Sequence, residues 1–182
     1  MTLCNFALTL ALAQAASLTG VVDLDGNPAD PLHADSKKAT VLFFVRTDCP
    51  ISNRYAPEIQ LLQKKFSEQA SFWLVYPDPS ETPGAIQKHL DAYGYRCGAL
   101  RDPKHVLVKA AGATVSPEAA LFAAAGKLVY HGRIDNRYIS PGKARATASV
   151  HDLESAIEAT LAGKAVVAAH MRATGCYLAD VQ

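Results

Sequence analysis

The sequence lacks an excess of charge of either sign. Its 18 lysines and arginines stand against 17 aspartates and glutamates, and they form no basic stripe and no acidic tail. We therefore do not expect a nucleic-acid partner. After the N-terminal segment there is also no apolar run long enough to cross a bilayer, so we expect no stable membrane insertion.

The N-terminus is the exception to this lack of apolar runs. The stretch "MTLCNFALTLALAQAAS" is apolar from Leu3 to Ala13, and Ala13-Gln14-Ala15 matches a signal-peptidase site. No lysine or arginine precedes the run, which leaves a buried first strand or helix as the alternative. We expect residues 1–15 to be a signal peptide and the protein to be periplasmic or secreted.

Cysteine is also scarce, with four residues in 182. Cleavage after Ala15 would leave Cys49, Cys97 and Cys176. An odd number allows at most one internal disulfide and one spare thiol, or three thiols kept reduced by a partner. Because a purely structural disulfide framework would leave no cysteine over, the count favours redox chemistry.

The length and the 49% hydrophobic composition predict a single domain with a sizeable core. We assign it to residues 16–178, with an irregular tail from about 164. The continuous apolar runs "TVLFFV" (40–45) and "SFWLVYP" (71–77) are typical of strands buried on both faces. "EAALFAAAGKLVYHGRI" predicts an antiparallel hairpin turning at Ala125-Gly126.

Helices are predicted between these strands. The first runs from about Pro50 to Phe66 with a kink at Pro57, and the last begins at Ser149 with Asp152 completing a capping box. The predicted order is β-α-β-α-β-α-β-β-α. Strands joined by helices are expected to be parallel neighbours. The fold class is therefore α/β, with a mixed central sheet flanked by helices on both faces.

Cys49 stands between the first buried strand and the helix that Pro50 begins. The free amides and positive dipole end of a helix favour a thiolate at this position. Arg46 would assist the thiolate, whereas Asp48 would oppose it. The interpretation is a reactive cysteine, and the alternative is an inert cysteine that caps the helix.

Three segments carry a family resemblance. "VLFFVRTDCPISNRYAPEI" resembles the active-site segment of the thioredoxin-like superfamily, "GATVSPEAALF" its cis-proline loop, and "AAGKLVYHGRID" the hairpin that follows. With "ATGCYL" near the C-terminus, the chain is most similar to the redoxin (AhpC/TSA) branch over about residues 18–178. The resemblance implies a thioredoxin-like fold and a cis Ser116–Pro117 bond that faces Cys49.

The departures from the superfamily patterns concern the partner of Cys49. Ser52 stands where a Cys-x-x-Cys motif has its second thiol, and Asn53 where copper chaperones have theirs. The peroxidase pattern would need proline and threonine or serine where Leu42 and Arg46 stand. Oxidised Cys49 must then become a sulfenic acid, bind a substrate thiol, or pair with Cys97 or Cys176. We favour Cys176 in the tail.

The predicted function is an exported thiol–disulfide oxidoreductase acting on a protein or small-molecule thiol or disulfide, with an unspecified electron donor. The alternatives are a one-cysteine peroxidase, and a non-enzymatic binding module or copper chaperone. We expect no cofactor and no metal, although histidines could bind a soft metal. The candidate catalytic residues are Cys49, Pro117, Ser52 and Arg46; the candidate pairing residues are Cys176 and Cys97; the histidines are His105, His131 and His170.

A charged cluster closes the predicted hairpin. It contains Arg133, Asp135 and Arg137 within "HGRIDNRY". It is either a solvated group of ion pairs or a charged rim that orients a substrate near Pro117.

Overall fold

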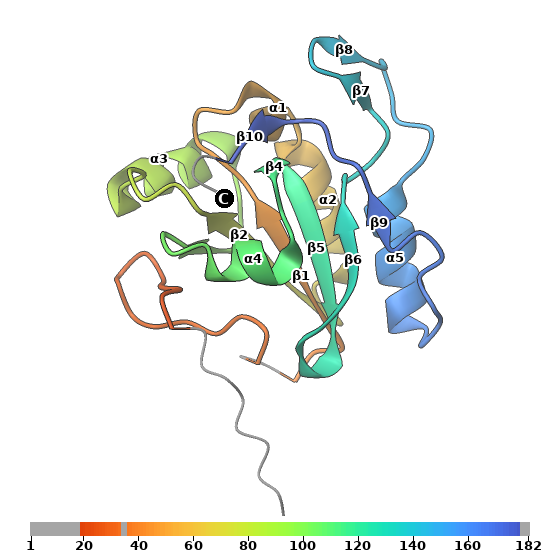
Figure 1. Cartoon of the computed structure of the whole chain (residues 1–182), viewed down its shortest axis with the longest axis horizontal. Helices are drawn as coiled ribbons and strands as arrows, with labels where there is room; N and C mark the ends of the chain where they lie inside the picture. Colours follow the sequence, from red (N-terminus) through yellow and green to blue (C-terminus); the bar gives the residue numbers. More distant parts are fainter. Residues whose placement is uncertain (1–18, 34–35, 179–182) are drawn as a thin grey trace, which may run out of the picture.

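The computed structural model describes residues 19–33 and 36–178, so the predicted signal peptide lies outside the described residues. Figure 1 shows a central sheet with helices on both faces. The helices are α1 (Pro50–Arg54), α2 (Ala56–Phe66), α3 (Pro83–Tyr93), α4 (Val106–Ala111) and α5 (Asp152–Leu161). The strands are β1 (Ala39–Phe44), β2 (Ala70–Tyr76), β3 (Gly98–Arg101), β4 (Val115–Ser116), β5 (Glu118–Ala123), β6 (Lys127–Gly132), β7 (Tyr138–Ser140), β8 (Lys143–Ala144), β9 (His170–Met171) and β10 (Cys176–Tyr177).

The main sheet has the strand order β3-β2-β1-β5-β6-β9. The helix-joined strands β1, β2 and β3 are parallel, and β5 runs antiparallel to both β1 and β6. The two-stranded pairs β4–β10 and β7–β8 are separate from it. The predicted mixed sheet is confirmed, and so is the hairpin, which turns through the short 3-10 helix Ala124–Gly126.

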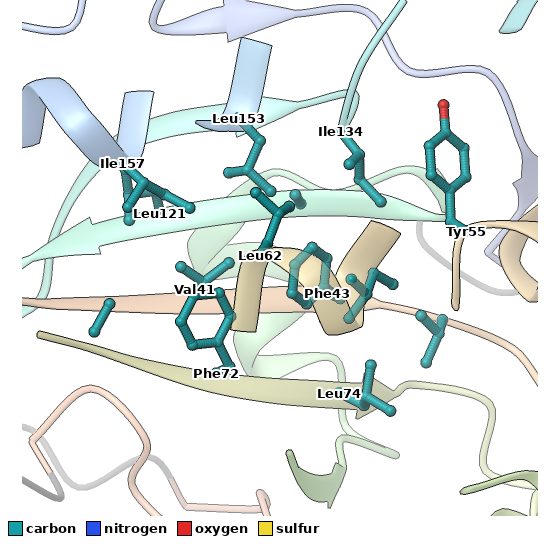
Figure 2. Packing of buried hydrophobic residues seen from close by; sticks show 14 of the residues in the cluster. Val41, Phe43, Tyr55, Leu62, Phe72, Leu74, Leu121, Ile134, Leu153 and Ile157 are labelled. Atoms are coloured by element: carbon teal, nitrogen blue, oxygen red, sulfur yellow. The ribbon is translucent and has the colours of Figure 1, made fainter. Parts of the chain in front are cut away.

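Strand β1 is buried along its whole length, because helices cover both sides of it. Val41 and Phe43 face α2 and α5, while Leu42 and Phe44 face α4. Figure 2 shows the first of these clusters, in which Leu62, Leu153 and Ile157 pack over the sheet. Full burial of each such side chain contributes about 1.5–3 kcal/mol to folding, so β1 is a firm support for the loop that follows it.

The predicted long helix is divided in two. Pro57 has no N–H to donate to the carbonyl of Asn53, which is four residues earlier. The chain instead closes a tighter turn, in which the Tyr55 amide donates to the Ser52 carbonyl at 2.9 Å, and α2 begins at Ala56. The break therefore precedes the proline, and the short helix α1 carries Cys49 at its start.

The predicted capping box at Ser149 is wrong. The Ser149 and Val150 amides donate to the side chain of Asn136, and the carboxylate of Asp152 binds Arg133 instead. Helix α5 consequently begins at Asp152. The tail after this helix contains the two short strands β9 and β10, separated by irregular chain. No helix among the described residues is long and apolar enough to cross a membrane.

Candidate functional site

Cys49 is the N-cap residue of α1 and is 1% exposed. Its backbone is extended, and its carbonyl accepts the Asn53 amide at 3.0 Å. The Ser52 amide points at the Cys49 sulfur from 3.5 Å. The sulfur therefore lies beside one of the free amides of the first helical turn.

The loop before β5 lies directly against this sulfur. The Ser116–Pro117 peptide bond is cis, and the Cys49 thiol donates a hydrogen bond to the Ser116 carbonyl at 3.1 Å. The two segments that carry the resemblance to the thioredoxin-like superfamily thus meet at one point, although 67 residues separate them in the chain.

Cys176 reaches the same point from the tail. Strand β10 pairs with β4 so that Cys176 lies opposite Ser116. Burial raises the pKa of the Cys176 thiol to about 11, and its hydrogen bond to the Cys49 sulfur contributes to the rise. The structure therefore brings Cys49, Ser116 and Cys176 together, and the cysteines are free thiols.

Gly175 permits this close pairing. A Cβ atom at this position would lie 2.1 Å from the Ser116 carbonyl oxygen. Real side chains essentially never approach backbone so closely, so β10 can only lie on β4 with glycine here.

Arg46 ties the loop of Cys49 to the tail. Its guanidinium binds both carboxylate oxygens of Asp48, at 3.0 and 2.9 Å, and donates to the Tyr177 carbonyl at 3.3 Å. Asp78 lies 3.7 Å away on the other side. These contacts are with Asp48, Asp78 and the tail, so Arg46 positions β10.

Cys97 lies away from this group. It directly precedes β3, whose Gly98 pairs with Trp73 of β2, and Trp73 in turn pairs with Leu42 of β1. Strands are about 4.8 Å apart, so Cys97 is about 10 Å to the side of β1, well before the position of Cys49 along it. A disulfide needs Cα atoms within about 7 Å, which excludes a Cys49–Cys97 bond in this arrangement.

A match to a protein family agrees with this geometry: the model of the AhpC/TSA family matches residues 12–131. The chain belongs to the AhpC/TSA family. Its fold is that of the thioredoxin-like redoxins. The matched residues include Cys49 and Pro117 and end before the tail that carries Cys176.

Solved structures share the fold. A hypothetical protein from Sinorhizobium meliloti is 25% identical, with a TM-score of 0.73 over 86% of this chain and 87% of that one. An uncharacterised conserved protein from Geobacillus kaustophilus is 23% identical, with a TM-score of 0.71 over 87% and 86%. A secreted disulfide oxidoreductase of Mycobacterium tuberculosis is 19% identical, with a TM-score of 0.53 over 81% and 97%. No curated protein matches the chain.

Two buried carboxylates, neither of them predicted from the sequence, hold the loops around Cys49. Glu81 accepts the Thr47 amide at 2.6 Å, and burial raises the pKa of this carboxyl. Glu118 accepts the amides of Thr114 and Val115, at 2.8 and 3.2 Å, just before the cis bond. Glu118 could have been noticed, because it opens a run of apolar residues.

The side chains of Asn53 and His89 connect α1 to the Thr47 loop and to β2. The Asn53 side chain donates to the Thr47 carbonyl at 3.1 Å and lies 2.8 Å from Nε2 of His89. The other imidazole nitrogen of His89 lies 2.8 Å from the Tyr76 hydroxyl. Burial lowers the pKa of His89, so the ring is a neutral bridge between α3 and the Cys49 loop.

Two hydroxyls beside the sulfur have no hydrogen-bond partner in the described part of the chain. They are the buried Oγ atoms of Ser52 and Ser116. Both residues already touch Cys49 through their backbones. A buried hydroxyl without a partner is costly, so each is available to a group that enters the site.

The predicted histidines do not gather at Cys49. His105 contacts the Pro77 carbonyl near α4. The rings of His131 on β6 and His170 on β9 lie with their centroids 4.1 Å apart, tilted by 38° to one another. Among the described residues one group could hold a metal, formed by Glu58, Asp135 and His151. Asp135 already accepts the Tyr55 hydroxyl at 2.6 Å and lies 4.0 Å from Arg137, which compensates its charge.

Proposed function

We propose that the protein is a thiol–disulfide oxidoreductase in which Cys49 is the nucleophile and Cys176 is the pairing cysteine. The observation that carries the proposal is the meeting of the Cys49 sulfur with the start of α1, the cis-proline loop and the Cys176 thiol. Membership of the AhpC/TSA family and a fold shared with a secreted disulfide oxidoreductase support it.

The reaction needs two exchanges. The Cys49 thiolate attacks a substrate disulfide, RS–SR, which forms a Cys49–SR mixed disulfide and releases RS⁻. The Cys176 thiolate then attacks the Cys49 sulfur and releases the second RS⁻. Two electrons pass to the substrate, the two cysteine protons are taken up by the released thiolates, and an external dithiol reduces the Cys49–Cys176 bond again.

The tail controls access to Cys49. Because Cys49 is 1% exposed and β10 pairs beside it, a substrate reaches the sulfur when β10 leaves β4. The return of β10 delivers Cys176 for the second exchange. Strand β10 has two residues. Its undocking also breaks the hydrogen bond from the Leu178 amide to the Thr114 carbonyl and withdraws the buried Leu178 side chain from the core.

The remaining candidate residues have supporting parts in this scheme. Pro117 positions the substrate chain beside the sulfur, and Ser52 presents its amide to the thiolate in place of a second thiol. Arg46 holds the docked tail through Tyr177. We further propose that the protein works outside the cytoplasm; the apolar N-terminus and its Ala13-Gln14-Ala15 match to a signal-peptidase site support this.

The test is a stoichiometric reaction with bis(2-hydroxyethyl) disulfide, followed by peptide mapping without reduction. We expect a Cys49–Cys176 disulfide and two equivalents of 2-mercaptoethanol, no reaction in Cys49→Ser, and an unchanged product in the control Cys97→Ser. A disulfide that excludes Cys49 would overturn the proposal. Rapid sulfenylation of Cys49 by peroxide, with no reaction towards disulfides, would favour the peroxidase instead.

A further inference from the structure

A cavity of about 700 Å³ lies along strands β4 and β10, which carry Ser116 and Cys176. Its wall includes Gly175 and Tyr177, the residues on either side of Cys176, and Thr114 and Val115 of the cis-proline loop. The β7–β8 hairpin, which Figure 1 shows above the chain between β9 and β10, contributes another wall. Cavities of this size are typical of small-molecule sites.

The cavity is rich in basic side chains. Arg133, Arg145, Arg172, His131 and His170 line it, against Glu118 as an acidic residue. Glu118 is already occupied, because it accepts two backbone amides and lies 3.4 Å from His131. The lining therefore favours an anion.

Two of the arginines are without a countercharge. Arg133 binds the carboxylate of Asp152 at 2.7 Å, so its charge is compensated. No described carboxylate forms an ion pair with Arg145 or Arg172, and the Arg145 guanidinium donates to the Asn136 carbonyl. Guanidinium groups bind carboxylates through paired, charge-assisted hydrogen bonds.

The site does not depend on the docked tail as a whole. Arg172 directly follows β9, which is fastened to β6 by the hydrogen bonds His131 N to Ala169 O, at 2.9 Å, and Arg133 N to Met171 O, at 3.0 Å. When β10 leaves β4, these bonds keep the segment that carries Arg172 on β6. The wall that Arg172 forms therefore stays in place when the tail moves.

We propose that this cavity recognises the carboxylates of a low-molecular-weight disulfide, which makes an anionic small disulfide the substrate class. The proposal rests on the proposed thiol–disulfide function. The bound carboxylates hold the disulfide beside Cys49, and the two exchanges described above then release two anionic thiols.

Three disulfides of similar size test the role of charge: 3,3′-dithiodipropionate with two carboxylates, neutral bis(2-hydroxyethyl) disulfide, and cationic cystamine. The readout is the second-order rate constant for mixed-disulfide formation at Cys49 in the Cys176→Ser chain at low ionic strength. We expect dithiodipropionate to react at least tenfold faster than the neutral compound and cystamine to react slowest. The preference should shrink in 0.5 M NaCl, because salt screens exposed charges.

The matched variants are Arg145→Gln/Arg172→Gln and the control Lys88→Gln/Lys127→Gln, which removes the same charge from exposed positions outside the cavity wall. We expect the arginine variant to lose the preference for dithiodipropionate while it keeps its rate with the neutral disulfide. Equal rates for all three disulfides, or an undiminished preference in the arginine variant, would overturn the cavity proposal and leave the redox proposal standing.

A binding measurement tests the cavity proposal without any disulfide exchange. Thiodiglycolate is a dicarboxylate thioether that cannot exchange, and calorimetry should show that it binds the unaltered chain but not the arginine variant. Failure of every disulfide to react would contradict the redox proposal alone. A disulfide-bonded acidic peptide that reacts tenfold faster than dithiodipropionate would replace the small-molecule class by a protein substrate.

Discussion

Cys97 and Cys176 have thiols with the same pKa, about 11, and they reach it in different ways. Burial beside the edge strand β3 is the whole cause of the rise at Cys97. At Cys176 the hydrogen bond to Cys49 and the charge of that sulfur add to burial. The two thiols therefore have the same acidity but different surroundings. Cys97 is partly buried against the core, whereas Cys176 faces another sulfur.

The largest expected effect comes from removing one of these thiols. In Cys176→Ser the mixed disulfide between Cys49 and bis(2-hydroxyethyl) disulfide should accumulate almost stoichiometrically, because nothing resolves it. In Cys97→Ser it should remain as transient as in the unaltered chain. Mass spectrometry of acid-quenched samples measures both. Accumulation in Cys97→Ser would remove the distinction between the two thiols.

The next effect concerns the contact that places Cys176. In Gly175→Ala the new methyl group would overlap the Ser116 carbonyl. Overpacking of this kind costs about 1–3 kcal/mol, so formation of the Cys49–Cys176 disulfide should slow by a factor between about 5 and about 150. Alkylation of buried Cys49 should become faster, and that of Cys97 should not change.

Gly84→Ala is the control for this substitution. Gly84 lies in α3, and a Cβ atom there would meet nothing within 4 Å. Alanine favours a helix over glycine, so neither the disulfide nor the alkylation rates should change. An undisturbed disulfide rate in Gly175→Ala would mean that β10 does not deliver Cys176.

A third test uses the origin of the raised pKa values. A raised pKa keeps a thiol protonated at neutral pH, so alkylation of Cys97 and Cys176 should rise about tenfold for each pH unit below about 10. In Cys49→Ala the hydrogen bond to Cys49 and the charge of its sulfur are lost, so the pKa of Cys176 should fall. The alkylation of Cys176 at pH 8 should then be severalfold faster. Cys97 should react as before. Cys49→Ser repeats the test without leaving a smaller side chain.

The sequence alone could predict the parts of the site that depend on neighbouring residues. The buried strand, the turn at Cys49 and the helix opened by Pro50 follow from an apolar run and a proline, and the fold class is confirmed. The Asp152 cap was mispredicted, because its partner Arg133 is 19 residues away. The register of Cys176 on Ser116 was out of reach, because a two-residue strand has no periodicity to detect.

The smallest effect is expected for Arg46, whose contacts hold the tail that carries Cys176. Its hydrogen bond to the Tyr177 carbonyl spans 131 residues, but the guanidinium is partly exposed and also bound to Asp48. Loss of this contact in Arg46→Ala should cost about 1 kcal/mol and slow Cys49–Cys176 disulfide formation a few-fold, measured by peptide mapping over time. Arg54→Ala removes an exposed arginine at the end of α1 and should have no effect. Equal slowing in both variants would assign the change to net charge and not to the tail. Slowing confined to Arg46→Ala would show that the reactivity of Cys176, unlike that of Cys97, depends on how firmly its strand is held.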